Sequence, residues 1–286
     1  MAINMDEDAF GAFERQGWES VAQAYHSYYA TLTHQSIDPL LDVLDLEPGA
    51  RLLDIATGPG YVAASAAGRG VNVVGLDFAV SMVELARRLN PAIEFHVGDA
   101  EALPFPDQSF DAVGSNFGWH HFPHPEKALS EAHRILRPGG KIAFTVWASP
   151  DKCAGIDMVL KAIAAHGDPD VDLPEAPPFF RFSDRHECER VLHEAGFAQV
   201  TVRDIDQTWC IRAPETPFHA LTRGGVRVAA ILRAQTSEAL ALIEEAVAES
   251  AIPYRIDEEV RVPMPAVLAA AKKIQGLRGP FPLGAL

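Results

Sequence analysis

Cysteine is scarce in this sequence. Its 286 residues include three cysteines, Cys153, Cys188 and Cys210, which lie far apart in the chain. An odd and dispersed set argues against a disulfide framework and against a zinc site built from thiolates. We therefore predict no bound metal and a reducing, cytoplasmic location.

Long apolar runs and basic residues are also few. No stretch reaches the roughly 18 consecutive apolar residues of a membrane-spanning helix, and residues 1–8 are acidic, unlike a signal peptide. Lys and Arg number 24 against 39 Asp and Glu, so the formal net charge is −15. Because such a field repels phosphate backbones, we expect no nucleic-acid partner. The expected partner is a small-molecule substrate, and a homodimer is compatible with the sequence.

One stretch has the pattern of a strand, a glycine turn and a helix. Residues 51–55 form a short apolar strand that carries Asp54, and a turn with Gly58 and Gly60 follows. Residues 61–67 then favour a helix. Glycines between a strand and a helix let backbone N–H groups approach a bound ligand. Taken alone, this turn is typical of nucleotide-type ligands in general.

Helical and strand patterns alternate along the chain. Helices are expected at 9–32, 37–46, 61–67, 81–89, 125–136, 183–195 and within 214–250, and residues 167–178 are expected to form a loop. Strands are expected at 51–55, 71–76, 93–97, 109–114, 141–147, 199–205, 255–262 and 266–271, with 199–205 and 266–271 antiparallel to each other. Asp38 and Ser183 are the predicted N-caps of two of these helices. The alternation predicts a doubly wound α/β fold, a parallel sheet with helices on both faces.

Acidic and polar residues follow the ends of four expected strands. They are the turn at 54–60, Asp77, the triplet Gly98-Asp99-Ala100 and the triplet Ser115-Asn116-Phe117. Ligands of open parallel sheets bind at the carboxyl ends of the strands. We therefore expect these four features to converge on one crevice.

Four motifs carry a resemblance to a known family. They are LLDIATGPG at 52–60, VVGLDFAVSMVELAR at 73–87, GDAEALPFPDQSFDAV at 98–113 and EAHRILRPGGKIAF at 131–144. With them the chain resembles the class I S-adenosylmethionine-dependent methyltransferases of the ubiquinone/menaquinone biosynthesis group (methyltransferase type 11). The motifs cover roughly a third of the chain, 51–147. One departure is Ala56, where the turn of this family often has glycine.

The resemblance implies a mostly parallel seven-stranded sheet, the Rossmann-like methyltransferase fold, with a helical cap. It also implies three regions. Residues 1–46 would be an N-terminal helical flap, although its aromatic stripe is also typical of a helix that packs on the domain. Residues 47–150 would be the S-adenosylmethionine-binding core. Residues 151–286 would complete the sheet and carry a substrate cap at about 213–262.

The resemblance further implies S-adenosylmethionine as cofactor, released as S-adenosylhomocysteine. The residues expected to hold it are Tyr25, Thr33, Asp54, Ala56, Thr57, Gly58, Gly60, Asp77, Phe78, Met82, Asp99, Ala100, Asn116 and Phe117. Among them Asp77 would accept hydrogen bonds from both ribose hydroxyls, and Asp99 one from the adenine amine. Asn116 would lie beside the sulfonium. Phe78 and Met82 would either flank the adenine or belong to the apolar core.

A general base is expected just past the fourth strand, where residues 118–124 read GWHHFPH. A hydroxyl acceptor must lose a proton, and histidine titrates near neutral pH. His121 is the first candidate and His120 the second. The alternative is that both histidines only pack or bind backbone groups.

The predicted reaction is methyl transfer to the oxygen or carbon of a phenol, quinol or acid of secondary metabolism. Residues 115–118 read SNFG, which is not the Asn/Asp-Pro-Pro-Tyr signature of amide and nucleobase N-methyltransferases. Three alternatives stay open: a small-molecule N-methyltransferase, a regulatory protein that binds the cofactor without transferring methyl groups, and a nicotinamide oxidoreductase.

Overall fold

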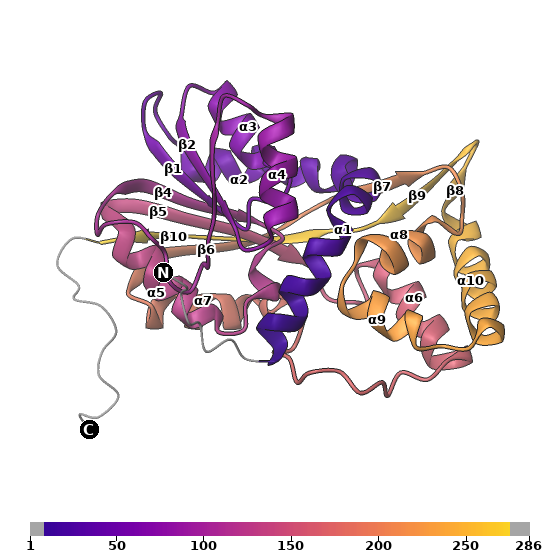
Figure 1. Cartoon of the computed structure of the whole chain (residues 1–286). Coiled ribbons are helices and arrows are strands. Elements are labelled where there is room, and N and C mark those ends of the chain that lie inside the picture. Colours follow the sequence, from indigo (N-terminus) through magenta and orange to yellow (C-terminus); the bar gives the residue numbers. More distant parts are fainter. Residues whose placement is uncertain (1–8, 275–286) are drawn as a thin grey trace.

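The computed structural model describes residues 9–274, and its centre is a seven-stranded sheet (Figure 1). The strands are β1 (Arg51–Ile55), β2 (Asn72–Asp77), β3 (Glu94–Val97), β4 (Phe110–Asn116), β5 (Leu136–Trp147), β6 (Phe197–Ile205) and β10 (Ala266–Lys273). Their order is β3-β2-β1-β4-β5-β10-β6. β10 is antiparallel to both of its neighbours, and the pairs among β1 to β5 are parallel. The predicted doubly wound, mostly parallel sheet is confirmed.

The central strands are apolar because both of their faces are covered. Every residue of β1 after Arg51 is buried. In β1 the backbone of Asp54 pairs with Gly75 on β2 and with Gly114 on β4. The parallel register therefore brings the carboxyl ends of β1, β2 and β4 to one edge of the sheet, as the sequence predicts.

Five helices of the described chain pack on this sheet: α2 (Ile37–Leu44), α3 (Tyr61–Gly68), α4 (Val80–Leu89), α5 (Pro125–Ile135) and α7 (Arg185–Glu194). Helix α1 (Ala9–Thr33) packs on α4, and α6 (Ala154–His166) packs on the second layer described below. Amphipathic patterns fix their orientation: α2, for example, buries the apolar side chains at 37, 40, 41 and 44 against β4 and β5. Short 3₁₀ helices lie at η1 (His34–Ser36), η2 (Trp119–His121), η3 (Arg181–Ser183) and η4 (Ile252–Tyr254).

The chain between β6 and β10 forms a second, smaller layer beside the sheet. It contains β7 (Thr208–Ile211), α8 (Thr216–Gly224), α9 (Arg227–Arg233), α10 (Ser237–Ala251), β8 (Arg255–Ile256) and β9 (Glu259–Pro263). Its strands form an antiparallel sheet in the order β7-β9-β8. Helix α1 packs on α4 of the core and on α8 of this layer, and in Figure 1 it lies between the two. The N-terminal helix thus contacts both parts.

Several local predictions are wrong. The expected strand at 255–262 is a hairpin, β8 and β9, and two further elements, β7 and α6, were not predicted. Asp38 is not an N-cap, because α2 already begins at Ile37 and the Asp38 carboxylate pairs with Arg69 instead. Most other boundaries shift by one or two residues, but β5 begins at Leu136, five residues before the expected start.

The predicted cap of α7 is also displaced. Asp184, and not Ser183, accepts a hydrogen bond from the backbone N–H of His186 at the start of the helix. The Ser183 hydroxyl bonds the carbonyl of Phe180. The terminal parts of the predicted regions, 1–8 and 275–286, lie outside the described residues. Among residues 9–274, no helix combines the length and the hydropathy that crossing a bilayer requires.

Candidate active site

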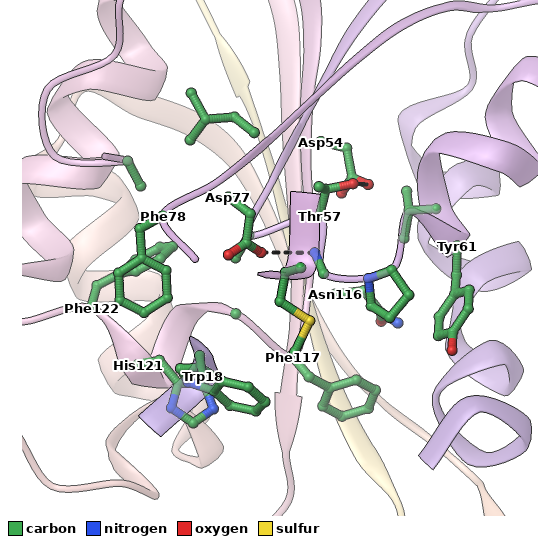
Figure 2. A pocket seen from close by; sticks show the side chains of 18 of the residues that line it. Trp18, Asp54, Thr57, Tyr61, Asp77, Phe78, Asn116, Phe117, His121 and Phe122 are labelled. Carbon is green, nitrogen blue, oxygen red and sulfur yellow. Dashed lines mark hydrogen bonds between the residues drawn. The ribbon is translucent and has the colours of Figure 1, made fainter. Parts of the chain in front are cut away.

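A cavity of about 870 Å³, partly open to solvent, lies at the carboxyl ends of β1, β2 and β4. Thirteen of the fourteen residues predicted to hold the cofactor line it: Tyr25, Thr33, Asp54, Ala56, Thr57, Gly58, Asp77, Phe78, Met82, Asp99, Ala100, Asn116 and Phe117. The exception is Gly60. Figure 2 shows Asp54, Thr57 and Asp77 on one side of this space and Phe117 and His121 on the other. The four strand-end features do converge on one crevice. We call this space the first cavity.

The glycine turn after β1 needs left-handed backbone at three positions. Ala56, Gly58 and Gly60 have φ values of 53°, 52° and 82°. For alanine this conformation costs about 1–2 kcal/mol relative to glycine. A side chain at Gly60 would place its Cβ 2.9 Å from Cζ of Phe95. Gly60 therefore serves the turn and its packing, and its contact with a bound cofactor stays a prediction.

Asp77 ends β2 and fixes the backbone around it. One carboxylate oxygen accepts from the N–H of Gly58 at 2.8 Å, the bond drawn in Figure 2, and the other accepts from the N–H of Ala79 at 3.0 Å. Burial raises the pKa of Asp77 to about 6, although these two bonds oppose the shift. Each oxygen retains a lone pair for a ligand hydroxyl.

Asp54 lies deeper, at the end of β1. Its Oδ2 accepts from the Thr57 hydroxyl at 2.6 Å and from the N–H of Ala63 at 3.2 Å. Its Oδ1 is buried and has no hydrogen-bond partner among the described residues. Burial raises the pKa of Asp54 to about 7, and the charge of Asp77 adds to the shift. A positively charged ligand would stabilise both carboxylates.

The side chains expected near an adenine ring occupy the end of the first cavity beside α4. Met82 is 2% exposed, and Phe78 and Trp18 pack against its cluster, so Met82 is both core residue and cavity wall. Asp99 accepts from the N–H of Glu101 at 2.8 Å. Ala100 is buried beside it.

Asn116 already has partners in the protein. Its side-chain oxygen accepts from the hydroxyls of Ser36 at 2.7 Å and Thr145 at 2.5 Å, and its amide donates to the carbonyl of Thr33 at 2.9 Å. It thereby fixes the end of α1 to the end of β4. Phe117 follows with φ of 59° and stacks on Trp147 with ring centroids 4.0 Å apart.

Helix α1 supplies Tyr25 and Thr33 to the first cavity. Burial raises the pKa of Tyr25 to about 12, and a hydrogen bond with the Thr33 side chain opposes this shift. Tyr25 also stacks on Tyr29 and meets Trp18 edge to face. These contacts hold the aromatic face of α1 toward the site.

A second cavity, of about 1250 Å³, adjoins the first. Trp18, Tyr25, Phe117 and His121 line both spaces. The remaining walls of the second cavity are mainly apolar and come from the N-terminal helix, from β5 and α6, from the chain before η3 and from the layer between β6 and β10. Its aromatic side chains are Phe10, Trp18, Tyr25, Tyr29, Phe117, Trp147, Phe179, Phe180 and Trp209.

The two candidate bases, His121 and His120, differ in the cavities that they line and in their hydrogen-bond partners. His121 lines both cavities, and its Nδ1 lies 2.8 Å from Oε2 of Glu14. His120 lines the second cavity alone, and neither of its ring nitrogens has a hydrogen-bond partner among the described residues. Burial, with the nearby His121, lowers the pKa of His120 well below its usual range.

Sequence reasoning missed Glu14, together with most of the second cavity. Glu14 is 2% exposed and also accepts from Trp18 Nε1 at 3.0 Å. It lies four residues before Trp18, so the aromatic stripe of the helix, extended by one turn, would have included it. The other walls come from segments without a motif.

Comparison with known proteins agrees with these observations. A family model described as a methyltransferase domain matches residues 53–144. A demethylmenaquinone methyltransferase of Renibacterium salmoninarum is 32% identical over 176 residues, which is 58% of this chain and 74% of that protein. The protein of the same name from Beutenbergia cavernae is 34% identical over 181 residues, 58% of this chain and 72% of that protein.

Solved structures share the fold at low identity. Phosphoethanolamine N-methyltransferase 2 of Haemonchus contortus, determined with phosphomonomethylethanolamine and S-adenosylhomocysteine, superposes with a TM-score of 0.56 at 19% identity, over 94% of this chain and 61% of that one. The [4+2]-cyclase SpnF gives 0.50 at 19% identity, over 85% and 81%. The fold alone thus does not fix the reaction. The curated relatives match over more than two thirds of their own length, and with the four motifs they show that this chain belongs to the class I S-adenosylmethionine-dependent methyltransferases of the ubiquinone/menaquinone group.

Proposed function

We propose that this methyltransferase acts on a hydroxylated aromatic small molecule, a phenol or quinol, and methylates its oxygen or a ring carbon. The observation that supports this most is the pair of adjoining cavities, which share four side chains and meet at His121. In this proposal the first cavity holds the cofactor and the second holds the acceptor. The curated relatives are named for a quinone-type substrate, which favours a quinol.

The first cavity has the chemistry that S-adenosylmethionine requires. Asp77 would accept from the ribose hydroxyls, and the unpartnered Oδ1 of Asp54 is an acceptor for an ammonium group. Phe78 and Met82 offer apolar surface to the adenine. When bound, the cofactor supplies a methyl group on a positively charged sulfur, and the two buried carboxylates suit that charge.

The second cavity suits a largely apolar, planar acceptor. Its aromatic walls would bury the faces of a ring and any apolar substituent, at about 25 cal/mol per Å² of apolar surface removed from water. Arg227 is the only basic side chain, Lys or Arg, among the described residues that line the second cavity. Its guanidinium group donates to the carbonyl of Pro174 at 2.8 Å. A carboxylic acid acceptor is therefore less favoured than a neutral phenol or quinol.

His121 is the proposed general base. No hydrogen bond joins its Nε2 to another described residue, and the ring lies where the two cavities meet. It would remove the proton of the acceptor hydroxyl while the oxygen, or a ring carbon conjugated with it, attacks the methyl group. The surrounding aromatic side chains would keep water from competing with the acceptor.

The proposal treats 1–46, 47–150 and 213–262 as flap, cofactor core and substrate cap. It also includes a cytoplasmic enzyme without a nucleic-acid partner. Size-exclusion chromatography with light scattering would distinguish a homodimer, which the sequence allows, from a monomer.

The test is turnover of the purified chain with S-adenosylmethionine and five acceptor classes: naphthoquinols, catechols, simple phenols, aromatic acids and amines. S-adenosylhomocysteine release gives the rate, and mass spectrometry with NMR locates the new methyl group. We expect the highest kcat/KM with a quinol or phenol. Turnover confined to amines would replace this proposal with N-methylation, and tight cofactor binding without turnover of any acceptor would favour a regulatory protein.

A further inference from the structure

One largely buried hydrogen-bond contact joins helix α1 to the candidate base. The carboxylate of Glu14 lies 2.8 Å from Nδ1 of His121, across 107 residues of sequence. The two side chains are 3% and 17% exposed. The same oxygen, Oε2, also accepts from the indole N–H of Trp18 at 3.0 Å. Glu14 and His121 both line the second cavity.

We propose that Glu14 is a positioning residue for His121: it holds the neutral imidazole with its proton on Nδ1 and stabilises the imidazolium that forms during transfer. This inference rests on the proposed function, because it assigns Glu14 a part in the same reaction. A carboxylate beside one ring nitrogen fixes the tautomer and leaves the other nitrogen as the proton acceptor. In this chain that acceptor is Nε2, which has no described partner.

The surroundings of the pair make the carboxylate the main partner for a charge on His121. Asp77 from β2 acts on His121 electrostatically, since the His121 charge lowers the pKa of Asp77. His120, the neighbouring ring on η2 at 4.3 Å, has a pKa well below its usual range and stays neutral. Arg227 from α9 lines the same cavity and bonds a backbone carbonyl. Trp18 and Phe179 contribute uncharged ring edges to His121.

The proton and electron balance of the step is simple. The acceptor O–H proton moves to Nε2 of His121, whose positive charge is then shared with the Glu14 carboxylate. The electron pair of the acceptor oxygen, or of the ring carbon conjugated with it, forms the new bond to the methyl carbon. After attack by a ring carbon, that carbon loses its own proton and the oxygen regains one, which restores the aromatic ring. The electrons of the broken carbon–sulfur bond remain on sulfur, which becomes a neutral thioether.

Because Glu14 belongs to α1, the orientation of His121 depends on how α1 packs on the core. The same helix presents Trp18 and Tyr25 to both cavities. One turn after Glu14, the carboxylate of Glu19 accepts from the N–H groups of Val80 at 2.5 Å and Ser81 at 2.9 Å, at the start of α4. The imidazole is therefore oriented while α1 is in place over the core.

Two variants separate the orientation of His121 from the charge of Glu14. In Glu14→Gln the Trp18 N–H requires an oxygen at the Oε2 position, so the amide oxygen stays there and still accepts from Nδ1 of His121. Tautomer and geometry are kept and the negative charge is lost. Glu14→Leu removes the acceptor altogether. Glu244→Gln is the matched control, because Glu244 pairs with His219 at 3.1 Å on helices α10 and α8 away from both cavities.

The readouts are kcat, KM and the ¹⁵N shifts of the His121 ring, assigned by their loss in His121→Gln. We expect Glu14→Gln to lower kcat about tenfold with unchanged KM and an Nδ1–H tautomer, and Glu14→Leu to lower kcat about 100-fold with a shift toward Nε2–H. Glu244→Gln should match the wild type. Thermal melting checks that each variant is folded.

The outcomes distinguish this inference from the proposed function. A wild-type enzyme that methylates no aromatic acceptor refutes the proposed function, whatever the tautomer of His121. A wild-type enzyme that is active, with Glu14→Leu or Glu14→Gln equal to it in kcat, refutes the role of Glu14. An unchanged Nδ1–H tautomer in Glu14→Leu would also overturn the inference, because some other group would then hold the ring.

Discussion

Replacing Asp77 with alanine should affect cofactor binding and stability through different contacts. In the proposed complex the carboxylate accepts two ribose hydroxyls. Hydrogen bonds to a charged group contribute about 1.5–3 kcal/mol each. The loss of both is about 3–6 kcal/mol, which corresponds to roughly a 10²- to 10⁴-fold weaker Kd at about 1.4 kcal/mol per tenfold.

The same substitution leaves two backbone donors without their acceptor. The N–H of Ala79 is buried and that of Gly58 is partly buried. An unpaired buried donor costs about 1–3 kcal/mol, so the variant should be less stable while keeping the fold. The size of this effect should depend on pH.

The sign of the pH effect follows from the raised pKa of Asp77. Its folded-state pKa of about 6 lies above the ordinary value of 3.8, so the folded chain binds the proton more tightly than the unfolded chain. The wild-type carboxylate therefore opposes folding increasingly as the pH rises from about 4 to 6, by up to about 3 kcal/mol. Removing the carboxylate removes this cost. The variant should be most destabilised near pH 4 and closer to the wild type above pH 7.

Calorimetric titration with S-adenosylhomocysteine and urea unfolding at several pH values measure both effects. Asp42→Ala is the control, because it removes an exposed ion pair with Arg69 that contributes about 0–1 kcal/mol. A folded Asp77→Ala variant whose Kd lies within threefold of the wild type would refute the ribose assignment. Equal destabilisation at every pH would refute the reasoning about burial.

Two further predictions concern the first cavity. The affinity for S-adenosylmethionine should rise from about pH 5 to about pH 8, because burial raises the pKa values of Asp54 and Asp77 to about 7 and about 6 and a cationic ligand binds the deprotonated forms. Titration calorimetry in buffers of different ionisation enthalpy should show protons released on binding near pH 6.5, and a pH-independent Kd would contradict the electrostatic argument. Gly118→Ala should lower stability by about 1–3 kcal/mol, since its Cβ would lie 2.4 Å from Cβ of Ala56. A melting temperature equal to that of the wild type would show that the backbone around Gly118 shifts at little cost to make room for the methyl group.

The sheet and the first cavity were predictable because local patterns encode them. Each strand end carries its own polar residue within a few positions of an apolar run, as with Asp77 at the end of β2. A parallel sheet brings such ends together by topology, so no long-range information was needed. Gly60 shows where such a pattern is ambiguous, because a glycine serves equally for close ligand approach and for packing under a neighbour, here Phe95.

The second cavity was less predictable because tertiary packing assembles it. The contact of Glu14 with His121 joins residues 107 positions apart, and neither residue belongs to a repeating pattern that includes the other. The strand β7 spans four residues and buries two of them, Trp209 and Ile211, so its alternating signal is short. The hairpin of β8 and β9 turns at Asp257, whose φ of 55° is unusual for a residue other than glycine. In contrast, α6 has apolar residues at helical spacing, and its signal was present.

A crystal structure of the chain with S-adenosylhomocysteine tests most directly whether the two cavities divide the reaction between them. We predict the nucleoside in the first cavity, with its ribose on Asp77 and its sulfur directed toward His121 and the second cavity. A nucleoside bound outside the first cavity, or one whose sulfur faces away from His121, would contradict the account.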